Sequence, residues 1–322
     1  MKKNHIAIGI QAFVITLSAA SYADGPIDGS VYGRLDVSYQ RNDNEATEDA
    51  FELRNNASRF GFKGATDLQN NLSVIYQIEY QVAPDDGDEG GDTITQRNTY
   101  VGLKGGFGTV MAGKHDTPLK MAQGKFDQFN DLNGDITTML EGENRASNIV
   151  MYGTPEMGSL KGMVAFIPGE DSTDEDMDGP VDGVSASLAY EAEALYVALA
   201  YDTDVLFNTQ DTIRLVATYT INALQLGGIY TTSDKDDAPF FGSGEDSEDG
   251  IGVSAAYTMG KHVIKAQYIT SEQKVADGSS LSLGVDCIQS KATKLYTFLT
   301  IRDGEADLAQ ESNLGVGVQH NF

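Results

Sequence analysis

Hydrophobic and polar residues alternate with a period of two along most of this chain. In residues 31–40, one face carries Val, Gly, Leu, Val and Tyr, whereas the other carries Tyr, Arg, Asp, Ser and Gln. Residues 72–81 and 314–322 repeat the pattern. Because successive side chains of a strand point to opposite sides of a sheet, each segment predicts a strand with one apolar and one polar face.

Further segments with strand character bring the predicted total to sixteen. They are residues 52–64, 95–104, 108–114, 147–154, 160–167, 183–190, 195–202, 211–220, 224–232, 250–258, 262–270, 280–288 and 293–301. The connections alternate in length: 105–107 and 259–261 are short, whereas 168–182 and 233–249 are long and acidic. This alternation predicts an up-and-down antiparallel sheet whose two ends differ.

One connection, at about residues 114–146, is much longer than the others. A connection of that length in a compact domain is functional or reflects a wrong assignment. We predict that it folds inward and narrows a channel formed by the rest of the chain. An ordinary surface excursion is the alternative.

The distribution of apolar residues favours a barrel over a membrane helix. Beyond the N-terminal segment, no stretch reaches the roughly twenty apolar residues that a transmembrane helix needs. The mean hydropathy of −0.28 is also typical of a barrel that alternates lipid-facing and lumen-facing residues. Sixteen strands leave a water-filled lumen. The sequence therefore predicts an all-β protein, a sixteen-stranded antiparallel transmembrane β-barrel.

The first 23 residues have the organisation of a secretory signal peptide. Lys2 and Lys3 precede an apolar segment at residues 6–20, and Ser21-Tyr22-Ala23 provides small residues where a signal peptidase cleaves. We therefore expect export and a mature barrel domain at residues 24–322.

The charge balance excludes one class of partner. The chain has 22 Lys and Arg against 48 Asp and Glu, a formal net charge of −26. Such a surface repels nucleic acid. The single cysteine, Cys287, cannot form an intrachain disulfide.

Acidic runs in the long connections predict at most weak binding of divalent cations. Asp174, Asp176 and Asp178 followed by Gly179 match the beginning of a calcium loop. The twelfth position is Ser185, whereas a complete site has a bidentate Glu there. We expect no cofactor and no specific metal site, and at most divalent bridging between these runs and lipopolysaccharide.

Four blocks of sequence resemble the general diffusion porins of Gram-negative bacteria. They are residues 31–35 (VYGRL), 58–64 (SRFGFKG), 100–108 (YVGLKGGFG) and 315–322 (GVGVQHNF). The resemblance covers the whole mature chain. It implies a homotrimeric barrel in the outer membrane, whose third long loop bends into the lumen and forms a constriction.

The resemblance also implies which residues line that constriction. Arg34, Arg59, Arg97 and Arg145 match wall positions of the porins, and Lys63 shares a strand face with Arg59. An arginine on the lipid face costs about 2–4 kcal/mol near the membrane midplane, which independently favours the lumen.

The opposing charges would come from the long connection. Asp127, Asp131 and Asp135 recur at four-residue spacing, which places them on one face if the segment is helical. A Pro-Glu-Phe-Gly-Gly-like run, familiar in porin loops, is absent from the sequence, so which of these acids reach the constriction stays open.

These features predict a passive channel for ions and small hydrophilic solutes, and not an enzyme. The acidic loops predict a weak preference of this channel for cations. Two alternatives stay open. A structural or adhesive barrel would have a plugged lumen. An outer-membrane hydrolase would need His115 beside a serine nucleophile.

Overall fold

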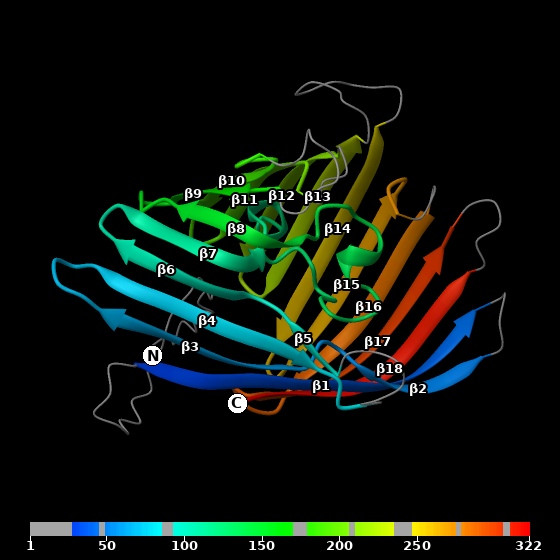
Figure 1. Cartoon of the computed structure of the whole chain (residues 1–322). Coiled ribbons are helices and arrows are strands. Elements are labelled where there is room, and N and C mark those ends of the chain that lie inside the picture. Colours follow the sequence, from blue (N-terminus) through cyan, green and yellow to red (C-terminus); the bar gives the residue numbers. More distant parts are fainter. Residues whose placement is uncertain are drawn as a thin grey trace, which may run out of the picture.

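A single antiparallel sheet closes on itself because its first and last strands pair. The computed structural model describes residues 28–44, 49–85, 93–169, 179–205, 210–234, 247–274, 278–304 and 310–322. The expected signal peptide at 1–23 and the acidic run at 174–178 lie outside these residues. Figure 1 shows the strands arranged as a tilted ring around a central space.

The strands of the first half are β1 (Gly29–Asn44), β2 (Ala50–Asn55), β3 (Arg59–Asp67), β4 (Ser73–Val82), β5 (Ile94–Gln96), β6 (Thr99–Gly105), β7 (Gly108–Asp116), β8 (Arg145–Gly153) and β9 (Leu160–Ile167). Those of the second half are β10 (Gly183–Glu191), β11 (Leu195–Thr203), β12 (Asp211–Ile221), β13 (Leu224–Asp234), β14 (Glu248–Met259), β15 (His262–Ser271), β16 (Gly278–Ile288), β17 (Thr293–Asp303) and β18 (Glu311–Asn321). The helix α1 (Pro118–Met121) and the 3-10 helix η1 (Ile136–Thr138) lie between β7 and β8. Within the described residues, no helix is both long and apolar enough to cross a bilayer.

Two of the predicted strands are each interrupted once. β1 pairs with both β2 and β3, and β4 pairs with both β5 and β6. At the first break Ala57 has a φ of 52°, which is outside the strand region. Because each interrupted pair occupies one place in the ring, the eighteen segments form the predicted sixteen-stranded barrel.

The first and last strands, β1 and β18, meet at the closing seam. Gly33 N donates to Phe322 O over 2.9 Å, and Phe322 N donates to Gly33 O over 3.0 Å. A Cβ atom at position 33 would lie 2.3 Å from Cζ of the Phe322 ring. Glycine at position 33 therefore lets the Phe322 ring lie directly over the seam.

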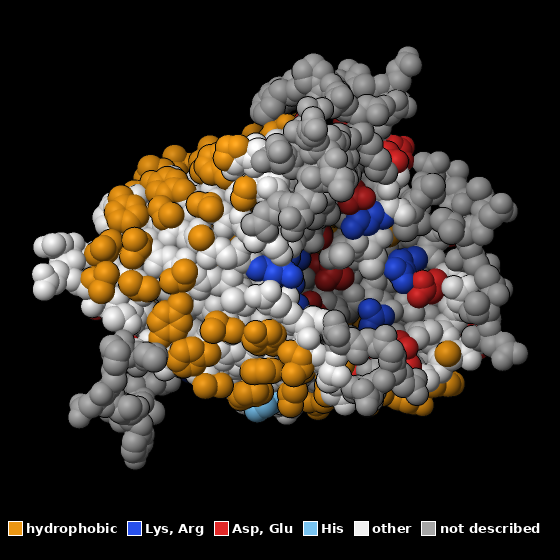
Figure 2. All heavy atoms as spheres, viewed as in Figure 1, with side chains coloured by type: hydrophobic (Ala, Val, Ile, Leu, Met, Phe, Trp, Pro, Cys, Tyr) orange, Lys and Arg blue, Asp and Glu red, His pale blue; other side chains and the backbone are white. Residues whose placement is uncertain are grey.

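The two faces of the wall differ as the alternation predicts. On β12, Leu215 and Tyr219 are exposed on the outer face, whereas Val216 and Thr218 are buried on the inner face. Figure 2 shows hydrophobic side chains spread over the outer wall, and charged side chains gathered around the hollow at one end. An outward apolar band with a polar interior suits a barrel surrounded by lipid.

The connection between β7 and β8 lies against the inner wall. Its fully buried apolar side chains are Leu119, Phe126, Phe129, Ile136, Met139 and Leu140. Several of them pack on Val216, Ile229 and Ile269, which are inward-facing residues of β12, β13 and β15. Fully burying one such side chain contributes about 1.5–3 kcal/mol, so this cluster is large enough to fix the connection inside the ring (Figure 1).

The ends of this connection differ slightly from the predicted 114–146. β7 continues to Asp116 and β8 begins at Arg145, so Lys114 and Arg145 belong to strands. Residues 117–144, called the constriction loop below, form the connection itself.

Substitutions on opposite faces of β4 test the assignment of the two surfaces. Ile78 is 45% exposed on the outer face, and the neighbouring Gln77 lies on the inner face. We expect Ile78→Arg to lower the free energy of unfolding by about 2–4 kcal/mol if it lies near the midplane, because the charge enters lipid. Gln77→Arg is the matched control and should have a much smaller effect. Urea unfolding of protein refolded into lipid vesicles measures both, and equal losses would contradict the assignment.

Candidate functional site

Two arginines from neighbouring strands face the lumen beside each other. Arg34 on β1 and Arg59 at the start of β3 are directly paired in the strand register. Like charges directly opposite each other across two strands destabilise a sheet. An anion between them is therefore needed at this position.

Asp131 of the constriction loop provides that anion. Its Oδ2 atom accepts a hydrogen bond from Arg34 Nη2 and another from Arg59 Nη2, the latter over 2.9 Å. Arg34 Nη2 also donates to Asn56 O over 3.1 Å. The break between β2 and β3 thus supplies a backbone acceptor beside the ion pairs. The structure brings Asp131 into contact with two of the predicted wall arginines.

The electrostatics of this contact keep Asp131 ionised. Burial alone would raise the pKa of the Asp131 carboxyl, but Arg34 and Arg59 outweigh it and hold the pKa below its ordinary value. The side chain is 15% exposed, so solvent screens these ion pairs less than pairs on the outer surface.

Arg97 forms a second ion pair on the same side of the lumen. It lies in the break between β5 and β6, and its Nε donates to Glu79 Oε1 over 2.8 Å. Its Nη1 donates to Gln81 Oε1 over 2.9 Å, and Tyr32 Oη donates to Glu79 Oε2 over 2.9 Å. The sequence prediction did not include Glu79 in the site, although its place on the polar face of 72–81 was the available signal.

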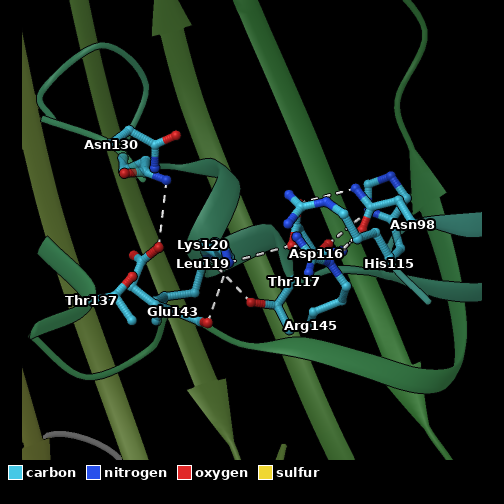
Figure 3. A network of polar contacts seen from close by, with 12 residues as sticks. Asn98, His115, Asp116, Thr117, Leu119, Lys120, Asn130, Thr137, Glu143 and Arg145 are labelled. Atoms are coloured by element: carbon cyan, nitrogen blue, oxygen red, sulfur yellow. Dashed lines mark hydrogen bonds and ion pairs between the residues drawn. The ribbon is translucent and has the colours of Figure 1, made fainter. Parts of the chain in front are cut away.

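Arg145 completes the wall at the base of the constriction loop. Figure 3 shows Arg145 and Lys120 directed at Asp116, with distances of 3.0 Å from Arg145 Nε and 3.5 Å from Lys120 Nζ. Asn98 Nδ2 donates to Asp116 Oδ2 over 3.0 Å, and Arg145 Nε donates to Asn98 Oδ1 over 2.8 Å. Arg145 therefore pairs with a carboxylate of its own wall and not with the loop aspartates.

Asp127 and Asp135 do not occupy one helical face with Asp131, because residues 122–135 do not form a helix. Asp127 Oδ1 and Oδ2 accept from the backbone N–H groups of Phe129 and Ile136. Asp135 Oδ2 accepts from Asp131 N over 2.6 Å, and its Oδ1 from Thr137 N over 2.8 Å. Both carboxylates thus hold the irregular backbone of the loop, and Asp131 alone contacts the arginines.

Lys63 shares the inner face with Arg59 but does not contact the loop acids. Its Nζ lies 4.7 Å from the centre of the Tyr32 ring. This is a cation–π contact between neighbouring strands.

His115 has the surroundings of a packed strand residue. It is buried, its Nδ1 lies 2.8 Å from Asp116 O, and its ring meets the Tyr100 ring edge-on at 5.3 Å. Across the described ranges, no group of three or more His, Cys, Asp or Glu side chains could hold a metal ion. The acidic run at 174–178 is not among those ranges.

Comparisons with known sequences and structures agree with this architecture. A family model described as Gram-negative porin matches residues 11–307. The major outer membrane protein P.IB of Neisseria sicca is 26% identical over 371 aligned positions, which cover 100% of both chains. The P.IB protein of Neisseria meningitidis serogroup B is 30% identical over 168 residues, 52% of this chain and 49% of that one.

Two solved structures share the fold. An anion-selective porin from Comamonas acidovorans superposes with a TM-score of 0.75 at 22% identity, covering 92% of this chain and 100% of that one. The trimer form of in-vitro folded OmpT from Vibrio cholerae superposes with a TM-score of 0.67 at 17% identity, covering 92% and 100%.

The lowered pKa of Asp131 predicts how its contacts respond to acid. A carboxyl whose pKa is depressed in the folded state contributes stability above its unfolded pKa of about 3.9, and this stability is lost as the pH falls through the folded pKa. Hydrogen-exchange protection of the Asp131 and Leu132 amides should therefore persist from neutral pH to about pH 4. In Asp131→Asn it should be about tenfold lower at neutral pH, a loss of about 1.4 kcal/mol.

Asp43→Asn is the control, because it removes an exposed ion pair with Arg41 outside the constriction loop. Its loop protection should match the wild type. Loss of the wild-type amide protection already near pH 5 would contradict the lowered pKa of the Asp131 carboxyl.

Proposed function

Because this chain belongs to the Gram-negative porin family and forms a passive diffusion channel in the outer membrane, we propose that Arg34, Arg59 and Asp131 control which ions pass through it. The observation that carries the proposal is the pair of ion contacts by which one loop carboxylate meets two wall arginines. Fixed charges at a narrow point of a channel set its selectivity.

Opposite charges meet where the constriction loop reaches the wall of the lumen. Arg34, Arg59, Arg97 and Arg145 all come from the wall formed by β1 and the strands up to β8. Asp127, Asp131 and Asp135 all come from the constriction loop. A solute that passes beside the contact of Asp131 with Arg34 and Arg59 therefore meets cationic wall groups and a loop carboxylate together, where bulk water screens them least.

The overall charge and the local charge act in opposite directions on ions. The chain as a whole carries −26, which concentrates cations near its surface. At the constriction, cationic side chains outnumber the acidic side chains that contact them. The cationic ones are Arg34, Arg59, Arg97, Lys120 and Arg145, and the acidic ones are Asp131, Glu79 and Asp116. We propose that the surface charge dominates at low salt and gives a weak cation preference.

The proposed assembly is a homotrimer in contact with lipid and lipopolysaccharide. The trimer form of the similar Vibrio OmpT supports this assembly, as does the apolar outer wall of the barrel. Acidic connections would bind lipopolysaccharide through weakly held divalent cations. The solutes are ions and small hydrophilic molecules, and the channel has no catalytic step.

Planar-bilayer recordings of the purified protein test the role of the constriction. Wild type should open in steps of three. Arg59→Ala should raise cation permeability relative to anion permeability, and Asp131→Asn should lower it, each by a factor of about two to five, or about 0.4–1 kcal/mol. Asn is chosen because residue 131 has a φ of 67°, which Asn tolerates better than Ala.

Arg41→Ala is the charge-matched control, because Arg41 is an exposed arginine that pairs with Asp43. If wild type conducts and both constriction variants have the same ion selectivity as the control, the proposal that Arg59 and Asp131 set the selectivity is wrong. If wild type does not conduct, the lumen is plugged and a structural or adhesive role is favoured.

Ionic strength should separate the surface charge from the charge at the constriction. The Debye length shortens from about 30 Å at 0.01 M salt to about 3 Å at 1 M, so exposed acids lose their effect first. The wild-type reversal potential should indicate cation preference at low salt, and this preference should fade as salt rises. Anion preference at every salt concentration would contradict the proposed role of the acidic surface.

A further inference from the structure

A further arginine lies on the opposite side of the lumen from the wall arginines. Arg214 faces inward from the middle of β12 and is completely buried. It is the largest fully buried side chain in the described part of the chain. A charge so far from water must be paired to be tolerated.

Every polar contact of Arg214 leads to the constriction loop or to the next strand. Nη1 donates to Glu143 Oε1 over 2.5 Å, and Nη2 donates to Glu141 O over 2.6 Å. Nη1 also lies 3.5 Å from Leu119 O, and Nε donates to Thr231 Oγ1 on β13 over 3.3 Å. The planar guanidinium thus satisfies acceptors in several directions at once, which a lysine ammonium at the same place could not match.

These acceptors come from both legs of the loop. Leu119 belongs to α1 on the outgoing leg, whereas Glu141 and Glu143 belong to the returning leg. Arg214 therefore joins the two legs to each other and to β12 at a single point.

Gly142 shows independently that the two legs pack closely here. It has a φ of +85°, and a Cβ atom at this position would lie 2.3 Å from Leu119 Cδ2. The same Cβ would lie 3.6 Å from Arg214 Nη2. Glycine is favoured on the returning leg because the backbone there has a positive φ and a Cβ atom would displace the Leu119 side chain.

We propose that Arg214 is a positioning residue, which fixes the constriction loop in the lumen and so holds Asp131 against Arg34 and Arg59 without touching the solute. Apolar packing of the loop on Val216 and Ile229 is strong but tolerates sliding. The hydrogen bonds of a buried guanidinium require one geometry and so set the register of the loop on the wall. This inference rests on the proposed function of the constriction.

Hydrogen exchange and single-channel recording of the assembled protein test the role. In Arg214→Lys, amides of residues 117–144 should exchange at least about tenfold faster, while strand amides keep their protection. The open-channel current should become noisier, because the loop moves while ions pass. Arg302→Lys is the matched control, because Arg302 donates to Glu311 of β18 over 2.7 Å and lies away from the constriction loop. This change should leave loop exchange and current noise as in wild type.

Two further variants keep the test decisive if Arg214→Lys does not fold. Glu143→Gln preserves size and leaves Arg214 its carbonyl acceptors, and Gly142→Ala strains the positive-φ backbone of the returning leg and crowds Leu119 without changing charge. Both should also increase exchange in the loop. Loop exchange equal to that of Arg302→Lys, or loss of protection throughout the strands, would overturn the positioning role. If these variants exchange faster in the loop but keep the wild-type selectivity and current, Arg214 positions the loop. The proposal that the constriction controls ion passage is then contradicted.

Discussion

The pairing of every backbone N–H and C=O group within the membrane is the constraint on which this structure depends. Hydrocarbon offers no hydrogen-bond partners, so a sheet can cross it only when its first strand pairs with its last. The pairing of β1 with β18 meets that requirement. Once the ring is closed, side chains have only two environments, lipid outside and the lumen inside, and the alternation along each strand follows.

The backbone of the constriction loop inside the closed barrel also needs hydrogen-bond partners. Residues 117–144 have little regular structure, so most of their backbone groups need partners other than a helix or a sheet. Asp127 and Asp135 provide some of these partners, and Arg214 satisfies carbonyl groups on both legs. Asp131 is left to meet the wall arginines. The loop thus divides its acids between holding its own shape and facing the lumen.

The barrel could be predicted from sequence because its signal is local and repeated. Each strand carries its own alternation, and short and long connections follow one another in a regular order. The break after β2 could not be predicted, because Ala57 adopts a positive φ that no residue pattern near it indicates. The break after β5 was missed as well, because residues 95–104 read as one continuous strand. These breaks place Asn56 and Arg97 where they contact the candidate site.

The candidate site was only partly predictable for a similar reason. Arg34 and Arg59 could be placed on the inner face from the parity of their strands, and the same rule applied to 211–220 would have found Arg214. Which loop aspartate meets the arginines could not be found that way. The position of each aspartate depends on the irregular backbone of the constriction loop, which shows no sequence periodicity. Contacts with strands distant in sequence fix that backbone, such as the hydrogen bond from Gln128 N to Gln267 Oε1.

The seam between Gly33 and Phe322 constrains the order in which the molecule assembles. The residues that complete the ring lie in β1 and β18, the first and last strands of the described chain, and are far apart in the sequence. Contacts so distant in sequence form slowly, because most of the chain must first be ordered between them. Hairpins between consecutive strands can form early, but the seam cannot join until β18 is available to pair with β1. Until then both edge strands present unpaired backbone groups, and the unfinished barrel needs protection from other chains.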